Sequence, residues 1–356
     1  MNISGFHDSF SPNHFPITHK KQHNYQSIIV KHSKQIINET IITKQITQIP
    51  YYSLFFSILE KHAPLNIHNT NDINDINDIN DINDTEKYYL FTYDNKFDIP
   101  MMEYFYSISN IKQLLFVSIR SFSYLLHSLS LLYNNNICLF NVSPENIVYQ
   151  LNSGENPLIK NFRSSLLTQP FHISSLCASV NGLSNFTYQP LEIHILYYLI
   201  KYDMNTISYS FIEEFCETFI SNLHILKLKL FTEQYKKSYK EQCIYIMKQY
   251  VNKSKNDIIN DIWNKHSKWD VYGISVIYIQ IFYSICITFS LNKTFFNTIV
   301  LKLTQNIHPN SNYRMTLERT IQIFNECFDK QKDWNFANQL EQSNTKMEEL
   351  FGNFSS

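Results

Sequence analysis

Three amide side chains stand where a chemical step could be organised. The segment Leu139-Phe140-Asn141-Val142-Ser143-Pro144-Glu145-Asn146 places Asn141 and Asn146 on either side of a proline, and Asn161 follows a short apolar run. An amide oxygen can orient a hydroxyl group, but it cannot accept a proton at neutral pH as a carboxylate does. It is also a poorer ligand than a carboxylate for a hard, strongly hydrated cation such as Mg²⁺. These residues therefore predict a site that can position groups but has little means to catalyse.

The segment 139–146 resembles the catalytic loop of the eukaryotic-type protein kinase family, which reads H-R-D-L-K-P-E-N. Residues Pro144, Glu145 and Asn146 are kept, whereas Phe140, Asn141 and Ser143 stand in place of the family's Arg, Asp and Lys. In that family the Asp takes the proton of the substrate hydroxyl, and the final Asn holds a magnesium ion. The resemblance implies that Asn141 is a degenerate base position and that Asn146 is a catalytic-loop and metal position.

Further motifs follow in the family's order, and the chain is similar to the divergent kinase-like proteins that large DNA viruses encode. The D-F-G motif is resembled by Asn161-Phe162-Arg163, with both flanking residues changed, and the A-P-E motif by Pro190-Leu191-Glu192. The start of the family's central helix is resembled by Asp270 to Ser275, and Arg314 matches the Arg that pairs with the A-P-E Glu. The resemblance implies that Asn161 occupies the main metal-ligand position. It also implies a buried ion pair between Glu192 and Arg314, and a structural Asp270 that holds the catalytic-loop backbone.

The nucleotide-binding residues of the small lobe are matched less fully. In the family a strand lysine grips the α- and β-phosphates and pairs with a helix glutamate. Lys31 and Glu39 match these positions, at a separation shorter than in most kinases, and Lys44 with Glu60 is a competing assignment by spacing. A glycine-rich loop is not visible, because Gly5 is the only glycine before Gly154. Backbone amides approach phosphates closely where Cβ atoms are absent, so ATP and Mg²⁺ are expected to bind weakly or not at all.

Hydrophobic spacing predicts the elements that must position these residues. The predicted strands are Tyr25–Val30, Lys87–Tyr93, Ile147–Tyr149 and Leu158–Lys160, with a turn at Ser153-Gly154 between the last two; the predicted helices are Ile36–Ile49, which carries Glu39 and stops at Pro50, Asn110–Tyr133, and most of the chain from Leu191 onward. The predicted fold class is α+β: a two-lobed, protein-kinase-like fold with a small mixed N-lobe and a large, mainly helical C-lobe.

The predicted domain organisation follows from these elements. Residues 1–24 form a flexible N-terminal segment, 25–100 an N-lobe with a low-complexity insertion at 69–86, 101–335 a C-lobe with a helical insertion at about 200–262, and 336–356 a C-terminal tail. The Asn-Asp-Ile repeat from Asn71 to Asp84 has too little apolar surface to fold alone, and a solvated loop is favoured over a metal site. The helical insertion, with stretches at Phe211–Leu230 and Glu233–Val251, either packs as core or receives a partner.

Charge and composition exclude some functions. The 30 basic and 31 acidic residues give a net charge of −1, which argues against the cationic field of a nucleic-acid-binding protein. The six cysteines are scattered without zinc spacing, as expected for free thiols in a reducing compartment. The polar N-terminus lacks the apolar region of a secretory signal. An intracellular, cytoplasmic protein is expected, and the viral resemblance implies a host cytoplasm or a virion.

One segment, Val271–Ser290, carries no charge over the twenty residues that a membrane span needs. Gln280 near its middle and several hydroxyl residues weaken that interpretation, since polar groups in lipid are costly. A buried core helix is favoured, and no membrane span is expected.

The residues favour a degenerate kinase-like domain, or pseudokinase, that acts by binding a protein partner, with weak or absent ATP binding. An alternative is a divergent but active serine/threonine kinase that transfers the γ-phosphate of ATP to a protein substrate through Lys31, Asn146 and Asn161. A third alternative is a membrane-anchored helical protein whose kinase-like motifs arise by chance.

Overall fold

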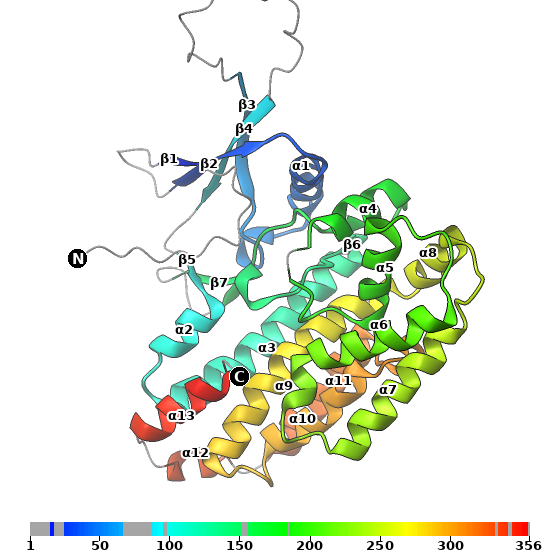
Figure 1. Ribbon diagram of the computed structural model, residues 1–356. Helices are drawn as coiled ribbons and strands as arrows, with labels where there is room; N and C mark the ends of the chain where they lie inside the picture. Colours follow the sequence, from blue (N-terminus) through cyan, green and yellow to red (C-terminus); the bar gives the residue numbers. More distant parts are fainter. Residues whose placement is uncertain are drawn as a thin grey trace, which may run out of the picture.

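The computed structural model describes residues 15–17, 25–66, 87–94, 98–150, 156–183, 185–331, 334–340 and 344–354. Within these residues the chain forms a small strand-rich lobe and a larger helical lobe, at the top and bottom of Figure 1. This arrangement confirms the predicted α+β, two-lobed fold class. The Asn71–Asp84 repeat and the turn at Ser153-Gly154 lie outside the described residues.

The small lobe is built on an antiparallel sheet. Its strands are β1 (Phe15–Ile17), β2 (Tyr25–Lys31), β3 (Leu59–Asn66) and β4 (Lys87–Asp94), in the order β1-β2-β4-β3. β-branched and aromatic residues such as Val30 and Phe91 suit a pleated, half-buried surface. Strand β1 lies inside the segment predicted to be flexible. Its polar surroundings gave no sign of a strand, because strand pairing uses main-chain groups that every residue carries.

Helix α1 (Lys34–Ile46) packs against this sheet. The Ser33 hydroxyl caps its first turn by accepting the N–H of Ile36 at 3.3 Å. Ile36 packs with Val30 of β2, Phe91 of β4 and Leu59 of β3. Glu39 lies on the same side of the helix three residues later and is 1% exposed, so the helix buries a carboxylate beneath the sheet.

Short strands connect the two lobes. β5 (Asp98–Pro100), β7 (Ile147–Gln150) and β8 (Pro157–Ile159) form one small sheet, and β6 (Ile137–Cys138) pairs with β9 (Leu166–Leu167). The small lobe is hydrogen-bonded directly to β8. The N–H of Ser57 donates to the carbonyl of Ile159 at 2.9 Å, and the N–H of Ile159 donates to the carbonyl of Phe55 at 3.0 Å. The segment that leads into β3 is thus tied to β8, the strand that precedes Asn161.

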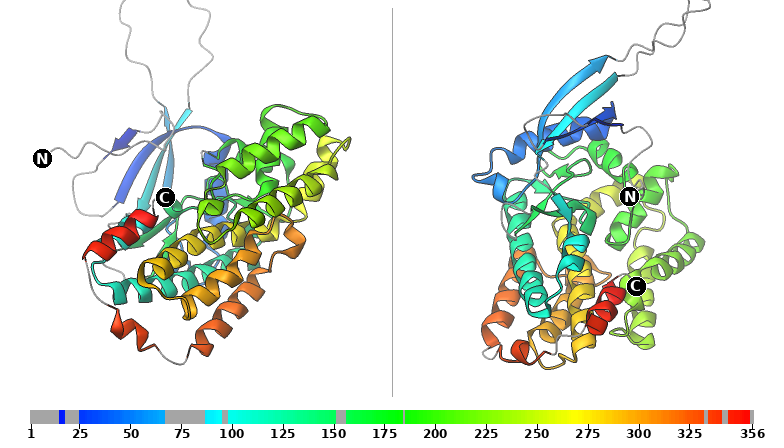
Figure 2. Two further views of the ribbon diagram at one scale, coloured as in Figure 1. Left: turned by 60° about the horizontal axis from the view of Figure 1, so that its bottom comes forward. Right: turned by 90° about the vertical axis from the view of Figure 1, so that its left-hand side faces the viewer.

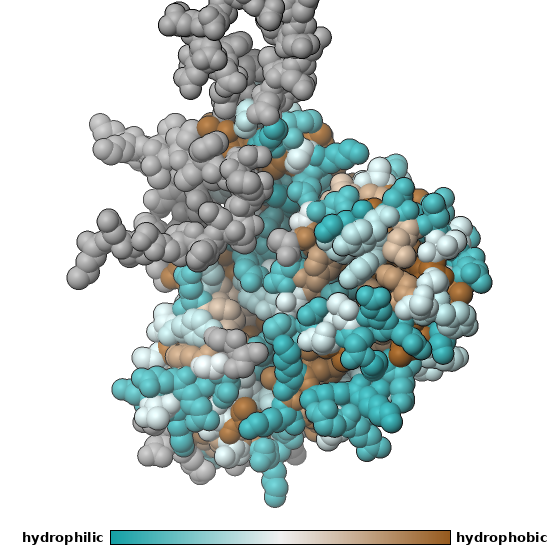
Figure 3. Space-filling view, in the orientation of Figure 1, coloured by the Kyte–Doolittle hydropathy of each residue, from teal (hydrophilic) through white to brown (hydrophobic). Residues whose placement is uncertain are grey.

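The large lobe is helical. Its helices are α2 (Met101–Ser107), α3 (Ile111–Asn134), α4 (Ile173–Asn181), α5 (Leu191–Lys201), α6 (Tyr209–Asn222), α7 (Glu233–Lys248), α8 (Lys255–Trp263), α9 (Trp269–Phe289), α10 (Phe295–Leu303), α11 (Leu317–Lys330), α12 (Phe336–Gln339) and α13 (Asn344–Phe354). The stretch predicted as helix from Phe211 to Leu230 stops at Asn222 and continues as a 3₁₀ turn at His224–Lys227. Helices α6 and α7 lie on the outside of the lobe, where Figure 3 shows mostly hydrophilic side chains with small apolar patches between them.

Helix α9 is the centre of this lobe, and the neighbouring helices α3, α10 and α13 surround it (Figure 2). The ring of Tyr278 lies 4.5 Å from the ring of Phe122 in α3, and its hydroxyl is 2.6 Å from that of Ser121. The described residues contain two helices that are long and apolar enough to cross a membrane, α3 and the segment that includes α9. The most apolar window of the α9 segment is 83% buried inside the protein, as expected for a core helix.

Candidate functional site at the lobe junction

The three asparagines identified from the sequence meet at the lobe junction, Asn141 through its main-chain carbonyl and the other two through their side-chain amides. Asn146 lies in the 3₁₀ turn Pro144–Asn146, and Asn161 lies two residues beyond the end of β8. The Nδ2 of Asn161 donates to Oδ1 of Asn146 at 3.0 Å, and the Nδ2 of Asn146 donates to the carbonyl of Asn141 at 2.9 Å. Asn161 has a φ of 64°, in the left-handed region that asparagine tolerates better than most residues. Asn141, Asn146 and Asn161 therefore form one hydrogen-bonded cluster.

Asp270 holds the loop that carries Asn141. Its two carboxylate oxygens accept the N–H groups of Leu139 and Phe140, both at 2.8 Å. Phe140 has a φ of 67°, which is strained for a bulky residue, and its buried ring lies edge-on to Trp269 at 5.7 Å between centroids. Burial raises the pKa of Asp270 to about 6, against the opposing effect of the two N–H donors. Asp270 thus fixes a strained backbone just ahead of the amide cluster.

Glu39 of α1 forms its ion pair with the segment after Asn161. Arg163 donates from Nε to Oε2 of Glu39 at 2.8 Å, and the Tyr93 hydroxyl donates to Oε1 at 3.0 Å. Burial alone would lower the pKa of Arg163, but the adjacent Glu39 carboxylate keeps that pKa above its ordinary value. Burial, together with the Glu39 charge, raises the pKa of Tyr93. The three residues form a unit around the buried Glu39 that we call the Glu39–Arg163–Tyr93 cluster.

Other contacts tie α1 to the same segment. The Nδ2 of Asn38 donates to the carbonyls of Arg163 at 2.9 Å and Ser165 at 2.6 Å. Phe162, between Asn161 and Arg163, is 1% exposed and packs edge-on against Phe56 of the small lobe at 6.0 Å. The two lobes are therefore joined by charge, by main-chain hydrogen bonds and by aromatic packing at one place.

Lys31 lies at the end of β2, on a different face from the one that meets α1. Its neighbour Val30 is 0% exposed and packs against α1, whereas Lys31 is exposed. Successive side chains of a strand point to opposite faces, so Lys31 faces away from the helix that carries Glu39. Among the described residues the ion pair of Glu39 is with Arg163 and not with Lys31. Lys44 and Glu60, the competing pair, are both exposed.

Glu192 and Arg314 form a buried ion pair below the junction. The Nη2 of Arg314 donates to Oε2 of Glu192 at 3.0 Å, with side-chain exposures of 1% and 7%. Arg314 also donates to the carbonyls of His308 at 2.7 Å and Pro309 at 3.0 Å. This pair fastens the start of α5 to the loop ahead of α11.

The residues at the junction do not fit a magnesium ion. Asn146 and Asn161 bring neutral amides, and the Oδ1 of Asn146 already accepts a hydrogen bond from Asn161. The described part of the chain holds no group of three or more His, Cys, Asp or Glu side chains placed to bind a metal. Mg²⁺ prefers carboxylate oxygens in octahedral geometry, and the one carboxylate that α1 supplies is engaged by Arg163.

Sequence reasoning missed the role of Arg163 and Tyr93. Arg163 was interpreted only as a change of the D-F-G glycine, and Tyr93 only as part of a strand. A buried glutamate requires a partner, because an unpaired buried charge is strongly unfavourable. The arginine two residues after Asn161 was therefore a detectable signal, once Glu39 had been placed on the buried face of its helix.

Comparisons with known proteins find only distant structural likenesses. No family model and no curated protein matches the sequence. The chain is similar to the solved structure of the autoinhibited serine kinase domain of the giant muscle protein titin, with a TM-score of 0.42 and 14% identity over 92% of this chain and 78% of that one. It is also similar to titin kinase with its flanking domains, at a TM-score of 0.42 and 13% identity, covering 46% of that longer chain. Likenesses this distant carry no conclusion about activity.

Proposed function

We propose that this chain is a degenerate protein-kinase-like domain that does not transfer phosphate and acts by binding a protein partner. One observation carries the proposal: the carboxylate of Glu39 is paired with Arg163, a cation of the chain itself, at 2.8 Å. In the kinase resemblance that carboxylate orients the lysine that grips the nucleotide phosphates. Here Arg163, beside the amide cluster, takes the place of that lysine as the partner of Glu39.

The amide cluster supports the same proposal. A general base contributes roughly 10²- to 10⁴-fold to a rate, and the amide of Asn141 cannot act as one. Asn161 brings no negative charge to the position that resembles the main metal ligand. The scaffold residues Asp270, Glu192 and Arg314 nevertheless keep their hydrogen bonds and ion pair. The described residues thus retain the contacts that shape the domain, and at the junction they offer neutral amides at the positions that resemble the base and the metal ligand.

The experiment combines nucleotide binding with phosphoryl transfer. Thermal unfolding of the full chain is measured with and without millimolar ATP and Mg²⁺, and transfer of labelled γ-phosphate to the chain and to generic protein substrates is followed. We expect a shift in melting temperature below about 1 °C, since a ligand stabilises a protein only as RT ln(1 + [L]/Kd). No transfer above a heat-inactivated sample is expected.

A matched variant makes a negative result informative. Combining Asn141→Asp with Asn161→Asp restores the two carboxylates of the family pattern and leaves the Glu39–Arg163 ion pair in place, so it serves as the reference for detecting Mg²⁺-dependent stabilisation. Label transfer by the unmodified chain that Lys31→Ala abolishes would overturn the proposal and favour the divergent serine/threonine kinase.

A further inference from the structure

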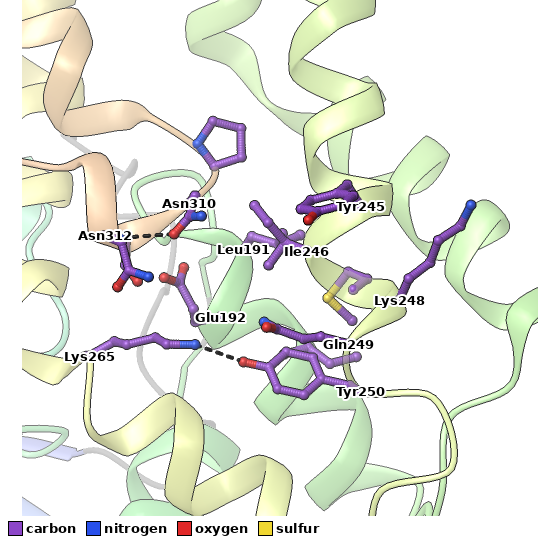
Figure 4. Close-up of a pocket in the computed structure, with 14 residues that line it drawn as sticks. Leu191, Glu192, Tyr245, Ile246, Lys248, Gln249, Tyr250, Lys265, Asn310 and Asn312 are labelled. Carbon is purple, nitrogen blue, oxygen red and sulfur yellow. Dashed lines mark hydrogen bonds between the residues drawn. The ribbon is translucent and has the colours of Figure 1, made fainter.

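A pocket of about 380 Å³ lies in the large lobe, between α5, the end of α7 and the loop that precedes Arg314 (Figure 4). This volume falls within the range of roughly 300 to 1,000 Å³ that is usual for ligand sites. Its walls include Leu191 and Glu192 at the start of α5, and the α7 end from Tyr245 to Tyr250. Helix α7 belongs to the helical insertion that ordinary kinases lack, so the pocket is a feature of this chain.

The lining combines an apolar interior with an accessible mouth. Leu191 and Ile246 lie close together in the cavity, and the ring of Tyr245 covers them from one side (Figure 4). Tyr245 is 78% exposed, an unusual exposure for an aromatic side chain at the mouth of a cavity. Exposed tyrosines beside a pocket are favoured at protein interfaces, because they bring a large contact area at a low entropic cost.

The charge around the pocket is positive. Lys265 is neutralised by its ion pair with Asp261 at 2.7 Å, whereas the exposed Lys253 places its Nζ 5.7 Å from the centre of the Tyr250 ring. Lys248 extends outward from the mouth (Figure 4). Residues 224–268 hold ten lysines against four acidic residues. Four of these lysines form ion pairs, namely Lys236 with Glu233, Lys240 with Glu217, Lys255 with Asp203 and Lys265 with Asp261, so the local surplus comes from the others, among them Lys248 and Lys253. Such a local surplus attracts acidic partners and rejects basic ones.

The carboxylate in the wall does not cancel this field. Glu192 is paired with Arg314, whose guanidinium lies directly behind the pocket wall and also donates to Pro309, another lining residue. The Nη1 of Arg314 is buried and has no hydrogen-bond partner among the residues that the structure describes.

We propose that this pocket docks an acidic protein segment that inserts one bulky apolar side chain. The proposal rests on the proposed function, since it assigns the partner-binding surface of a domain that acts by binding. The apolar side chain packs against Leu191, Ile246 and Tyr245, while flanking carboxylates of the partner approach Lys248 and Lys253. The positive rim supplies fast association and selectivity, and the cavity supplies most of the affinity.

The test uses the full chain and a displayed library of random 12-residue peptides. We expect selection to enrich peptides that combine several acidic residues with one aromatic or large aliphatic residue. The most enriched peptide is then synthesised with a fluorophore, and its affinity is measured by anisotropy. Replacing its apolar residue by alanine, or its acidic residues by the corresponding amides, is expected to weaken binding at least tenfold.

Three variants locate the binding. Lys248→Glu reverses a charge at the mouth, and Gln249→Trp fills the cavity from its exposed edge. Both are expected to weaken the peptide at least tenfold without changing the melting temperature. Lys293→Glu makes the same charge change and is expected to leave the affinity unchanged. Lys293 follows the C-terminal end of α9, and the length of that helix, at 1.5 Å per residue, separates it from the pocket by about 30 Å.

The outcomes separate this proposal from the proposed function. Failure to enrich acidic peptides, or equal binding to all three variants, overturns the docking site. Full displacement of the peptide by millimolar phosphate, at an ionic strength matched with chloride, also overturns it, because the pocket would then be a small-anion site. Phosphate transfer measured on the same samples tests catalysis alone. Peptide docking combined with phosphate transfer would overturn only the inactive-kinase proposal, and the absence of both would overturn only the docking site.

Discussion

Asp270 is a buried carboxylate whose two oxygens both accept backbone N–H groups of the 139–140 segment. Its raised pKa shows that burial outweighs these hydrogen bonds in favouring the neutral form. A carboxyl group whose pKa is higher in the folded state stabilises the fold fully below its unfolded pKa of 3.8, and this contribution is lost as the pH rises through about 6.

The first prediction concerns this titration. Between pH 4 and pH 7 the unmodified chain should lose about 3 kcal/mol of unfolding free energy relative to Asp270→Asn, from a difference of about two pKa units at 1.36 kcal/mol each. Urea unfolding across this range measures the difference. Asp329→Asn on the exposed surface of α11 is the control, because it removes a carboxylate that does not touch the 139–140 backbone. Parallel pH profiles for the chain and Asp270→Asn would contradict the prediction.

At the scale of single residues, the sequence predicted which asparagines meet at the lobe junction, but not which cation pairs with Glu39. Asn141, Asn146 and Asn161 could be placed together from motif order, and the structure joins them by hydrogen bonds. The face of Lys31 could not be predicted, because Ile28, Ile29 and Val30 are all apolar and leave the alternation of the strand undefined. A shift of one residue moves a strand side chain to the opposite face. The sequence therefore could not predict whether Lys31 faces Glu39.

Among the helices, α9 explains how polar residues are accommodated in an apolar core. Gln280, Ser284 and Thr288 recur every four residues and so lie along one face, which meets α13. Gln280 donates to the carbonyl of Phe354 at 2.7 Å, and the side chain of Asn353 donates to Thr288 at 3.3 Å. The last carbonyls of a helix have no partner within the helix, so α9 supplies a C-terminal cap for α13 from its side.

The second prediction is that Gln280→Leu destabilises the chain by roughly 1 to 3 kcal/mol, the cost of leaving a buried carbonyl unsatisfied. The added apolar surface does not compensate, because the carbonyl of Phe354 still requires a donor. Urea unfolding is the measurement. Gln234→Leu, the same substitution at an exposed position of α7, should change the unfolding free energy by less than about 0.5 kcal/mol. A stabilised Gln280→Leu chain would show that α9 prefers a wholly apolar environment, as a membrane helix does.

The apolar character of α9 was readable from the sequence, but its partner was not. Residues 336–356 were predicted as a tail, whereas α13 buries Met347, Leu350 and Phe354 against the large lobe. These positions follow helical spacing, although the segment is short and mostly polar. Such a helix is stable mainly through tertiary packing, which a local pattern does not reveal.

For the whole molecule, the Glu39–Arg163–Tyr93 cluster decides how the lobes are held. The third prediction is that Glu39→Gln and Arg163→Met each cost roughly 3 to 5 kcal/mol, because each leaves a buried charge without its partner. The double variant should cost clearly less than the sum of the two single variants. Urea unfolding of the four proteins gives the coupling energy.

The exposed pair Arg319–Glu326 of α11 is the matched control, since its N–O distance is 3.4 Å and its side chains are 48% and 42% exposed. An equivalent cycle with Arg319→Met and Glu326→Gln should give a coupling below about 1 kcal/mol. Equal coupling in the two cycles would show that the Glu39–Arg163 pair does not hold the lobes. X-ray scattering of Arg163→Met should also show a larger radius of gyration, whereas ATP and Mg²⁺ should leave that of the unmodified chain unchanged.

Arg163 is part of the polypeptide, so its concentration beside Glu39 does not vary with metabolism. A domain joined in this way keeps one shape in a starved cell and in a well-fed one. Under the proposed function, the amount of complex that it forms then follows how much of each protein is synthesised and degraded, and carries no information about the energy supply.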